Sequence, residues 1–247
     1  MIRLILKKYL YKIKYKKMSL IKLILIGDTQ VGKTAIINQY VNNSFTEEYM
    51  PTFSQDKFNK EIILKNETKL KLEIWDTIGQ ENLRAANKIF MKGAKIALLV
   101  YDITNKKSFT NLNEFYKQVC DINGKDKIII GVVGNKNDLY EERVVEENEG
   151  QKYAKDIGAS FFETSAKDHD TIENLFLDIC EQFIKKVNEN NNDGKDNSNN
   201  KNEGNNEEDK QKKSNDAIKK FDDAPLDGSF FLKENKKNPK KKDVVGK

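Results

Sequence analysis

Short runs of apolar residues alternate with stretches of helical spacing between residues 18 and 187. An apolar run is typical of a strand buried on both faces, and strands that alternate with helices indicate a parallel sheet covered by helices. The pattern predicts strands at residues 20–26, 57–64, 70–75, 95–101, 127–133 and 160–163. It predicts helices at residues 33–41, 108–122, 147–157 and 171–187. The expected fold class is therefore α/β, with helices on both faces of a six-stranded, mostly parallel sheet.

Two segments refine this arrangement. Between the second strand and the third, the segment at residues 65–68 is short enough for a hairpin turn, so this pair should be antiparallel. The last helix carries one apolar stripe, formed by Ile172, Leu175, Phe176, Ile179, Phe183 and Val187. Because these residues recur every three or four positions, we expect the stripe to close the hydrophobic core.

The composition changes after residue 187. Residues 188–247 contain 13 Asn, 14 Lys and 13 acidic residues and almost no aliphatic run. Such a segment cannot bury enough apolar surface to offset the entropy of ordering, so it is predicted to be a disordered tail. Residues 18–187 are long enough for one well-buried domain, and no second globular domain is expected.

The charge is also unevenly distributed. Residues 1–17 hold seven Lys or Arg and no acid, whereas residues 18–187 hold 23 basic and 26 acidic residues. A mildly acidic domain argues against a nucleic-acid-binding face. The basic arm at residues 1–17 has two interpretations, either contact with an anionic membrane surface or translation that truly begins at Met18.

Two further observations concern compartment. No stretch approaches 18 uncharged apolar residues, so no membrane span is predicted. Cys120 and Cys180 both lie within apolar helical patterns. This fits small buried side chains in a reducing compartment better than a disulfide framework or a metal site.

The candidate chemistry begins between the first strand and the first helix. The segment GDTQVGKT, residues 27–34, fits the pattern G-x-x-x-x-G-K-[ST]. The glycines let backbone N–H groups converge on phosphate oxygens, Lys33 can reach the β- and γ-phosphates, and the Thr34 hydroxyl can ligate Mg²⁺. The alternative is an ordinary glycine-rich turn. The pattern in this context favours phosphate binding, but it identifies neither the base nor the reaction.

Three further segments follow strands at the same edge of the predicted sheet. In WDTIGQE, Asp76 can join a Mg²⁺ shell, Gly79 can contact a γ-phosphate and Gln80 can orient a water. The segments NKND (135–138) and ETSAK (163–167) follow the fifth and sixth strands. Open α/β sheets bind ligands at the carboxyl ends of their strands, so all three segments should face the phosphate loop.

The ordered set GDTQVGKT, WDTIGQE, NKND and ETSAK resembles the Ras superfamily of small GTPases, over residues 19–187. Within that superfamily the chain is most similar to the Rab branch. The residues that carry this similarity are Trp75 before DT-x-GQE, FMKGA (90–94), VYDIT (100–104), Ser108-Phe109 and Asn111-Leu112. The resemblance implies a P-loop NTPase G domain at residues 18–187 that acts as a GTP/GDP switch in vesicle trafficking. The NKND and ETSAK segments disfavour a P-loop kinase or ATPase.

The resemblance also implies a guanine site. Asp138 would accept hydrogen bonds from guanine, and adenine, with no 2-amino group, would leave this carboxylate unpaired. Phe45 would pack against the nucleotide, although a core aromatic residue fits its local sequence equally well. The expected nucleotide-binding residues are Asp28, Thr29, Gln30, Val31, Gly32, Lys33, Thr34, Ala35, Phe45, Thr52, Gly79, Asn135, Lys136, Asp138, Ser165, Ala166 and Lys167.

For hydrolysis, the resemblance implies Mg²⁺ ligands at Thr34, Thr52 and Asp76, and catalytic roles for Lys33 and Gln80. Positioning and electrostatics are expected to perform the catalysis. No Arg is identifiable as a finger in cis, so hydrolysis should be slow without a GTPase-activating protein. The other expected partners are effectors and an exchange factor. We expect a monomer that binds no nucleic acid.

The chain departs from the family pattern in two places. Ile78 stands where the family has a small Ala, and a β-branched side chain there would crowd the hinge before Gly79. The second hypothesis is therefore a GTP-binding interaction module with impaired hydrolysis. In addition, no Cys follows Cys180, so prenylation is not expected. The expected location is cytoplasmic, with peripheral contact through basic termini to the cytosolic face of endomembranes as the open alternative.

Overall fold

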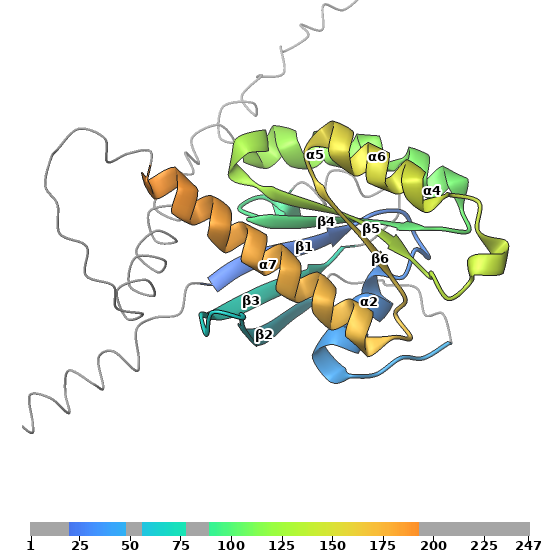
Figure 1. Ribbon diagram of the computed structural model, residues 1–247, viewed down its shortest axis with the longest axis horizontal. Coiled ribbons are helices and arrows are strands. Elements are labelled where there is room, and N and C mark those ends of the chain that lie inside the picture. Colours follow the sequence, from blue (N-terminus) through green and yellow to red (C-terminus); the bar gives the residue numbers. More distant parts are fainter. Residues whose placement is uncertain (1–19, 48–55, 78–88, 193–247) are drawn as a thin grey trace, which may run out of the picture.

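The structure is a computed structural model of the 247-residue chain, and it describes residues 20–47, 56–77 and 89–192. One six-stranded sheet with the order β2-β3-β1-β4-β5-β6 runs through the centre (Figure 1). Only β2 and β3 pair antiparallel, as the short 65–68 turn predicts. The other neighbouring strands are parallel. The predicted α/β fold class is confirmed.

The strands follow the sequence pattern to within about two residues at each end, a usual margin for element boundaries. They are β1 (Leu20–Ile26), β2 (Lys57–Ile63), β3 (Lys69–Asp76), β4 (Ile96–Asp102), β5 (Ile129–Asn135) and β6 (Ser160–Thr164). The largest shift is in β5, whose predicted start lies in the 3-10 helix η2 (Lys125–Lys127). The ladder to β4 and β6 continues to Asn135, beyond the last aliphatic residue of the run.

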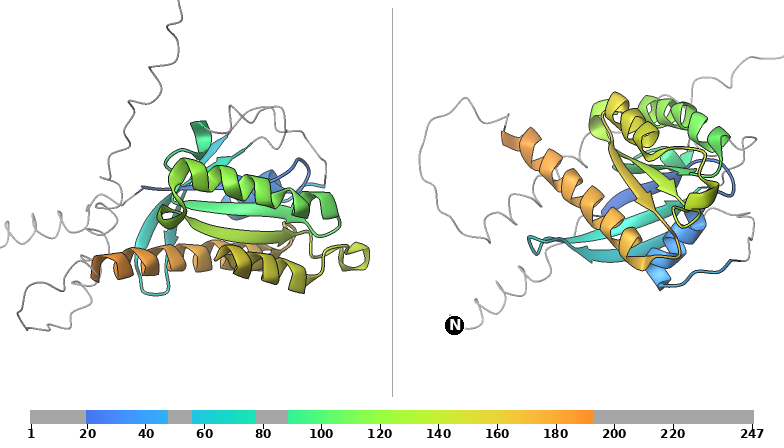
Figure 2. Two further views of the ribbon diagram at one scale, coloured as in Figure 1. Left: turned by 90° about the horizontal axis from the view of Figure 1, so that it is seen from above. Right: turned by 45° about the vertical axis from the view of Figure 1, so that its right-hand side comes forward.

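Helices cover both faces of the sheet (Figures 1 and 2). One face packs against α2 (Lys33–Asn42) and α7 (His169–Asn192), and the other against α5 (Leu112–Asn123) and α6 (Glu147–Ile157). Side chains of each central strand alternate between the two cores, because successive residues of a strand point to opposite faces. In β1, for example, Leu25 joins the α2 and α7 side, and Ile26 joins the α5 and α6 side.

The predicted stripe of the last helix closes the first of these cores. Ile172, Phe176 and Ile179 have no exposed surface, and the Phe176 ring stacks on Tyr40 of α2 at a centroid distance of 3.7 Å. The helix begins two positions before the predicted start and continues past Val187 to Asn192. None of the described helices is long and apolar enough to cross a membrane.

One predicted helix was wrong. The segment predicted as a single helix at 108–122 consists of α4 (Lys106–Thr110) and α5, which meet at Asn111. Side chains fix the start of α4, two residues before the predicted start: Asn105 caps α4 by accepting from the Lys107 and Ser108 N–H groups, and the Ser108 hydroxyl donates to the Asn105 carbonyl at 2.7 Å. Short polar side chains compete with backbone hydrogen bonds in this way at helix ends.

The thiols agree with their predicted placement only in part. Both cysteines are free, but Cys180 of α7 is buried and Cys120 of α5 is partly exposed. Burial raises the pKa of Cys180 to about 12.

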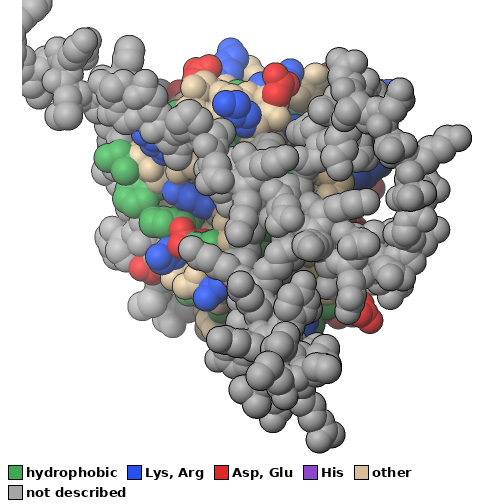
Figure 3. All heavy atoms as spheres, turned by 90° about the vertical axis from the view of Figure 1, so that its left-hand side faces the viewer, with side chains coloured by type: hydrophobic (Ala, Val, Ile, Leu, Met, Phe, Trp, Pro, Cys, Tyr) green, Lys and Arg blue, Asp and Glu red, His purple; other side chains and the backbone are tan. Residues whose placement is uncertain are grey.

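On the face drawn in Figure 3, the visible described Lys and Arg side chains lie among Asp and Glu side chains. The described part of that face therefore has no continuous basic patch.

Candidate functional site

The phosphate loop, residues 27–32, connects β1 to α2 and is closed by Lys33. Its Nζ donates hydrogen bonds to the carbonyl oxygens of Gly27 and Asp28, at 2.9 and 2.7 Å. Lys33 is 6% exposed. Burial lowers the pKa of its ammonium group to about 8, although the charges of Asp76 and Asp28 oppose this shift. The cation thus lies inside the loop, where it holds the two carbonyl groups and can meet a phosphate.

Left-handed backbone conformations shape the loop. Gly32, at the start of α2, has a φ of 96°, and a Cβ atom there would lie 2.3 Å from Nδ2 of Asn135. Gln30 has a φ of 65° although it is not glycine. Its exposed side chain points away from the core. This conformation costs a residue with a Cβ atom roughly 1–2 kcal/mol, so strain is stored in the loop at Gln30.

The candidate metal site lies where β3 meets the first turn of α2. Thr34 Oγ1 donates to Asp76 Oδ2 at 2.6 Å, and Thr77 Oγ1 donates to the Leu25 carbonyl at 2.6 Å, which fixes the end of β3 against β1. Asp76 is 1% exposed. Burial raises its pKa, whereas the Thr34 hydrogen bond and the Lys33 charge lower it. Its other oxygen, Oδ1, is buried with no hydrogen-bond donor among the described residues.

These residues fit Mg²⁺. A buried carboxylate oxygen without a donor needs a cation or a water to satisfy it. Within the described ranges, no group of three or more His, Cys, Asp or Glu side chains could hold a metal by itself. Mg²⁺ usually takes one or two protein oxygens and completes its shell with phosphates and waters. Thr34 and Asp76 are therefore suited to a Mg²⁺ ion that is shared with a nucleotide.

Asn135 joins the phosphate loop to the segments that follow β5 and β6. Its Nδ2 donates to the Val31 carbonyl at 2.8 Å, and its Oδ1 accepts from Thr164 Oγ1 at 3.2 Å. The backbone N–H of Asn137 donates to the Thr164 carbonyl at 3.0 Å. Asn135 is 1% exposed. Three predicted segments, distant in sequence, are thus brought together at one edge of the sheet.

Asp138 and the ETSAK loop form the candidate base site. Ser165 Oγ donates to Asp138 Oδ1 at 2.7 Å, and Lys167 Nζ lies 3.3 Å from Asp138 Oδ2. Burial raises the pKa of Asp138, but the hydrogen bonds from Ser165 and Lys167 outweigh it, and the pKa lies below its ordinary value. An ionised carboxylate held in this way can accept two N–H donors from one edge of a ligand.

Phe45 borders this base site. The Lys167 ammonium lies 5.7 Å from the centre of the Phe45 ring and 3.3 Å from Glu47 Oε1. The ring is partly buried and also packs against the core on the α2 and α7 side. Its position agrees with both sequence interpretations, a core aromatic residue and a wall of the nucleotide site.

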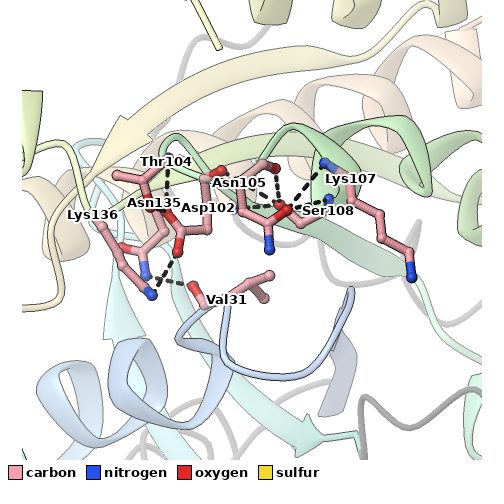
Figure 4. A network of polar contacts seen from close by, with 8 residues as sticks. All are labelled: Val31, Asp102, Thr104, Asn105, Lys107, Ser108, Asn135 and Lys136. Carbon is pink, nitrogen blue, oxygen red and sulfur yellow. Dashed lines mark hydrogen bonds and ion pairs between the residues drawn. The ribbon is translucent and has the colours of Figure 1, made fainter. Parts of the chain in front are cut away.

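The lysine of the NKND segment has a partner that the sequence did not predict. Lys136 Nζ lies 2.6 Å from Asp102 Oδ2, at the end of β4 (Figure 4). Asp102 Oδ1 accepts from the backbone N–H and the hydroxyl of Thr104, both at 2.8 Å. Lys136 itself has a φ of 66°. The buried Asp102 carboxylate therefore anchors the side chain that the family resemblance places beside the base.

A second pair that the sequence did not predict supports the same loops. Arg143 donates to Glu163 through Nη1 and Nη2, at 2.6 and 2.9 Å, and its Nη1 also donates to the Val145 carbonyl. Glu163 opens the ETSAK segment, and Arg143 follows the NKND segment. A two-point contact of this kind fixes orientation as well as distance, so the pair holds the two base loops in register.

The remaining predicted site residues fall into two groups. Ala35 lies in the first turn of α2, Thr29 is exposed in the phosphate loop, and Ala166 is buried between Ser165 and Lys167. Thr52, Gly79 and Gln80, like Ile78, lie outside the described residues.

Comparison with known proteins gives consistent matches. The sequence model of the Ras family matches residues 22–185. The GTP-binding protein Rab-3D of Rattus norvegicus is 38% identical over 168 residues, which cover 68% of this chain and 76% of the relative. The Ras-related protein Rab-10 of Caenorhabditis elegans is 39% identical over 168 residues, covering 68% and 83%. The Ras-related protein Rab-7b of Paramecium octaurelia is 41% identical over 170 residues, covering 67% and 82%.

Proposed function

Since the chain belongs to the Ras family and is most like its Rab members, we propose that it is a Mg²⁺-dependent GTP/GDP switch in vesicle trafficking. The observation that carries guanine specificity is the Asp138 carboxylate, which Ser165 and Lys167 hold in place. Asn135 links this carboxylate's loop to the phosphate loop through the Val31 carbonyl. One ligand can therefore contact both loops at once.

The test of guanine specificity is competition for the unmodified protein's nucleotide site. Labelled GDP is bound to the full chain and displaced by unlabelled GDP or ADP. We expect GDP to compete at least about 1,000-fold better, because adenine cannot donate to the Asp138 carboxylate that it would cover, and a site built to hydrogen-bond its ligand can reject an analogue by factors of 10⁴–10⁵. Equal competition by the two nucleotides would exclude this function.

The phosphates would be bound by the N–H groups of the loop, by Lys33 and by a Mg²⁺ ion at Thr34 and Asp76. When bound, Mg²⁺ neutralises negative charge on the phosphate oxygens. The chain's own contribution is positional: Thr77 fixes the end of β3 to β1, and Lys33 places its ammonium inside the loop. Thr52 would join the site only in the GTP state.

Removal of Mg²⁺ tests the metal site. We expect chelation with EDTA to speed the release of labelled GDP at least about tenfold, which corresponds to roughly 1.4 kcal/mol of lost binding energy. The measurement is the dissociation rate from the full chain in the presence of excess unlabelled GDP. Restoring Mg²⁺ before dissociation begins is the control. A release rate that does not respond to chelation would contradict the roles of Thr34 and Asp76.

Hydrolysis in this proposal relies on Gln80 to orient water and on Lys33 to stabilise charge on the transferred phosphoryl group. No Arg of this chain is assigned as an arginine finger that stabilises charge in the transition state, so turnover is slow until a GTPase-activating protein binds. Loss of the γ-phosphate would release Thr52 and Gly79. The segments around them would then change conformation and be read by effectors and by an exchange factor.

Ile78 motivates the second candidate function, a GTP-binding interaction module with impaired hydrolysis. An Ile methyl group near the γ-phosphate would exclude the attacking water, and a misplacement of about 1 Å can cost roughly 100-fold in rate. We therefore expect Ile78→Ala to speed single-turnover hydrolysis of preloaded GTP, with and without an activating protein, while guanine affinity is unchanged. An Ala variant that is equally fast or slower would contradict the crowding argument and favour the switch as it stands.

The flanking segments complete the proposal. The proposed GTPase domain comprises residues 18–187, and its last helix continues to Asn192, so residues 188–192 of the segment predicted as a disordered tail are helical. The basic residues 1–17 contact an anionic membrane surface if they are translated. Mass spectrometry of the native N-terminus distinguishes a start at Met1 from a start at Met18. The protein acts as a monomer in the cytoplasm and at the cytosolic face of endomembranes.

A further inference from the structure

Asp28 places a carboxylate in the loop that is to bind phosphates. Its Oδ2 accepts a hydrogen bond from Nδ2 of Asn111 at 2.8 Å, across 83 residues of sequence. Its carbonyl oxygen accepts from Lys33 Nζ. The Asp28 carboxylate is close enough to Lys33 for its charge to act on that ammonium group. One residue therefore gives its carbonyl group to Lys33 and places a negative charge in the loop beside that ammonium group.

That negative charge is unfavourable for the ligand. Like charges near a protein surface repel more strongly than in bulk water, because the effective dielectric constant there is lower. The repulsion falls if the carboxylate is held to one side and donors stabilise its charge. Asn111 provides such a donor, since an amide N–H bound to a carboxylate forms a charge-assisted hydrogen bond.

Asn111 is well placed to hold this position. It is the residue at which α4 ends and α5 begins, and its backbone N–H donates to the Lys107 carbonyl. The α4 helix is itself fixed, because the Ser108 hydroxyl accepts from the backbone N–H of Asp102 at 3.0 Å. Asp102 in turn pairs with Lys136 of the base loop (Figure 4). The same contacts that hold α4 against the end of β4 therefore support both the Asn111 amide and the base site.

We propose that Asn111 is a positioning residue that holds the Asp28 carboxylate away from the bound phosphates and thereby slows nucleotide release. This inference rests on the proposed function, since it concerns the same nucleotide site. The backbone of Asn111 is helical, with φ −70° and ψ −16°, and its side-chain amide reaches the Asp28 carboxylate of the phosphate loop.

The test is an amide-to-acid substitution and its reversal. Asn111→Asp removes the donor and sets a carboxylate against the Asp28 carboxylate. We expect labelled GDP to dissociate from the full chain about tenfold faster or more, because losing a hydrogen bond to a charged group costs roughly 1.5–3 kcal/mol. The exchanged pair, Asp28→Asn with Asn111→Asp, restores a donor opposite an acceptor. It should bring the release rate back to within about threefold of the unmodified protein.

The matched control is Gln118→Glu. Gln118 lies on α5, which Asn111 precedes, and its amide likewise faces a carboxylate, with Nε2 donating to Glu114 Oε1 at 3.4 Å. The change therefore makes the same amide-to-acid replacement about two helical turns further along the chain, where the neighbouring carboxylate belongs to Glu114 and not to the phosphate loop. We expect no change in GDP release. Thermal unfolding with saturating GDP checks that the compared variants are folded.

Three outcomes would overturn the proposed role of Asn111. These are an Asn111→Asp variant that releases GDP at the unmodified rate, an exchanged pair that stays as fast as Asn111→Asp alone, and a Gln118→Glu control that is equally fast. If Asn111→Asp does not fold, Asn111→Ala takes its place, and its release rate should fall when Asp28→Ala removes the carboxylate. Failure of the unmodified protein to prefer GDP over ADP would instead refute the proposed function.

Discussion

Replacement of Asp138 by asparagine is expected to weaken GDP and GTP binding at least about 100-fold and to admit xanthine nucleotides. The Asp138 carboxylate offers two acceptor oxygens, one held by Ser165 and the other by Lys167. Asparagine keeps the shape but replaces one acceptor with an N–H₂ donor. That donor would meet the donors of guanine, whereas it suits the 2-oxo group of xanthine. Mismatched polar groups in a binding site reject a ligand by factors of 10⁴ or more.

The measurement is competition between GDP and xanthosine diphosphate for both proteins. Asp126→Asn serves as the control, because it makes the same chemical change at an exposed residue of η2. Its guanine preference should be that of the unmodified chain. If Asp138→Asn bound GDP as tightly as the unmodified protein, the base site would not lie at Asp138. The interpretation of NKND as the segment that binds guanine would then be wrong.

The sequence predicted the sheet well because apolar runs mark central strands such as β1 and β4, and a short turn marks the β2 and β3 pair. β1 was predicted to the residue, and the antiparallel β2 and β3 pair followed from the length of its turn. The prediction failed where the helical spacing of apolar residues continued through the boundary at Asn111, so that residues 108–122 were predicted as one helix. The contacts of Asn105 and Ser108, which set the start of α4, leave no mark in hydrophobic periodicity.

In the candidate site, too, the sequence predicted one part and missed another. The motifs predicted which segments meet, since the carboxyl ends of neighbouring parallel strands lie at one edge of a sheet. They did not predict the side-chain pairs that hold these segments, such as Lys136 with Asp102 or Asn111 with Asp28. Each pair joins residues far apart in the chain. Its geometry depends on where α4 and the strand ends lie relative to one another in the folded protein. Asp102 at the end of β4 was the one available signal, as a charged residue that closes an apolar strand.

Gly27 carries the largest expected effect on stability. A Cβ atom at Gly27 would lie 2.1 Å from the carbonyl oxygen of Val100 and 3.1 Å from its carbonyl carbon. Val100 cannot retreat, because it is fully buried in β4 and pairs with Val133 of β5. We expect Gly27→Ala to lower the free energy of unfolding by on the order of 4 kcal/mol or more, which is in the range of severe overpacking.

The same substitution should damage nucleotide binding. Lys33 Nζ donates to the Gly27 carbonyl, so any shift of Gly27 away from β4 moves the ammonium group and the turn that follows. Urea unfolding of the nucleotide-free protein gives the loss of stability, and labelled GDP gives the loss of affinity. If Gly27→Ala fails to fold under conditions in which the control variant Gly158→Ala folds, that result would also support the clash with Val100.

The control is Gly158→Ala, at the residue after α6. Gly158 has a φ of 73°, and a Cβ atom there would have no neighbour within 4 Å. Its substitution introduces backbone strain without a clash, for which we expect a cost of only about 1–2 kcal/mol. Equal losses for the two variants would mean that backbone strain, and not the contact with β4, sets the cost at Gly27. In that case β1 and β4 could separate at the phosphate loop, and the loop would be less rigid than its contacts imply.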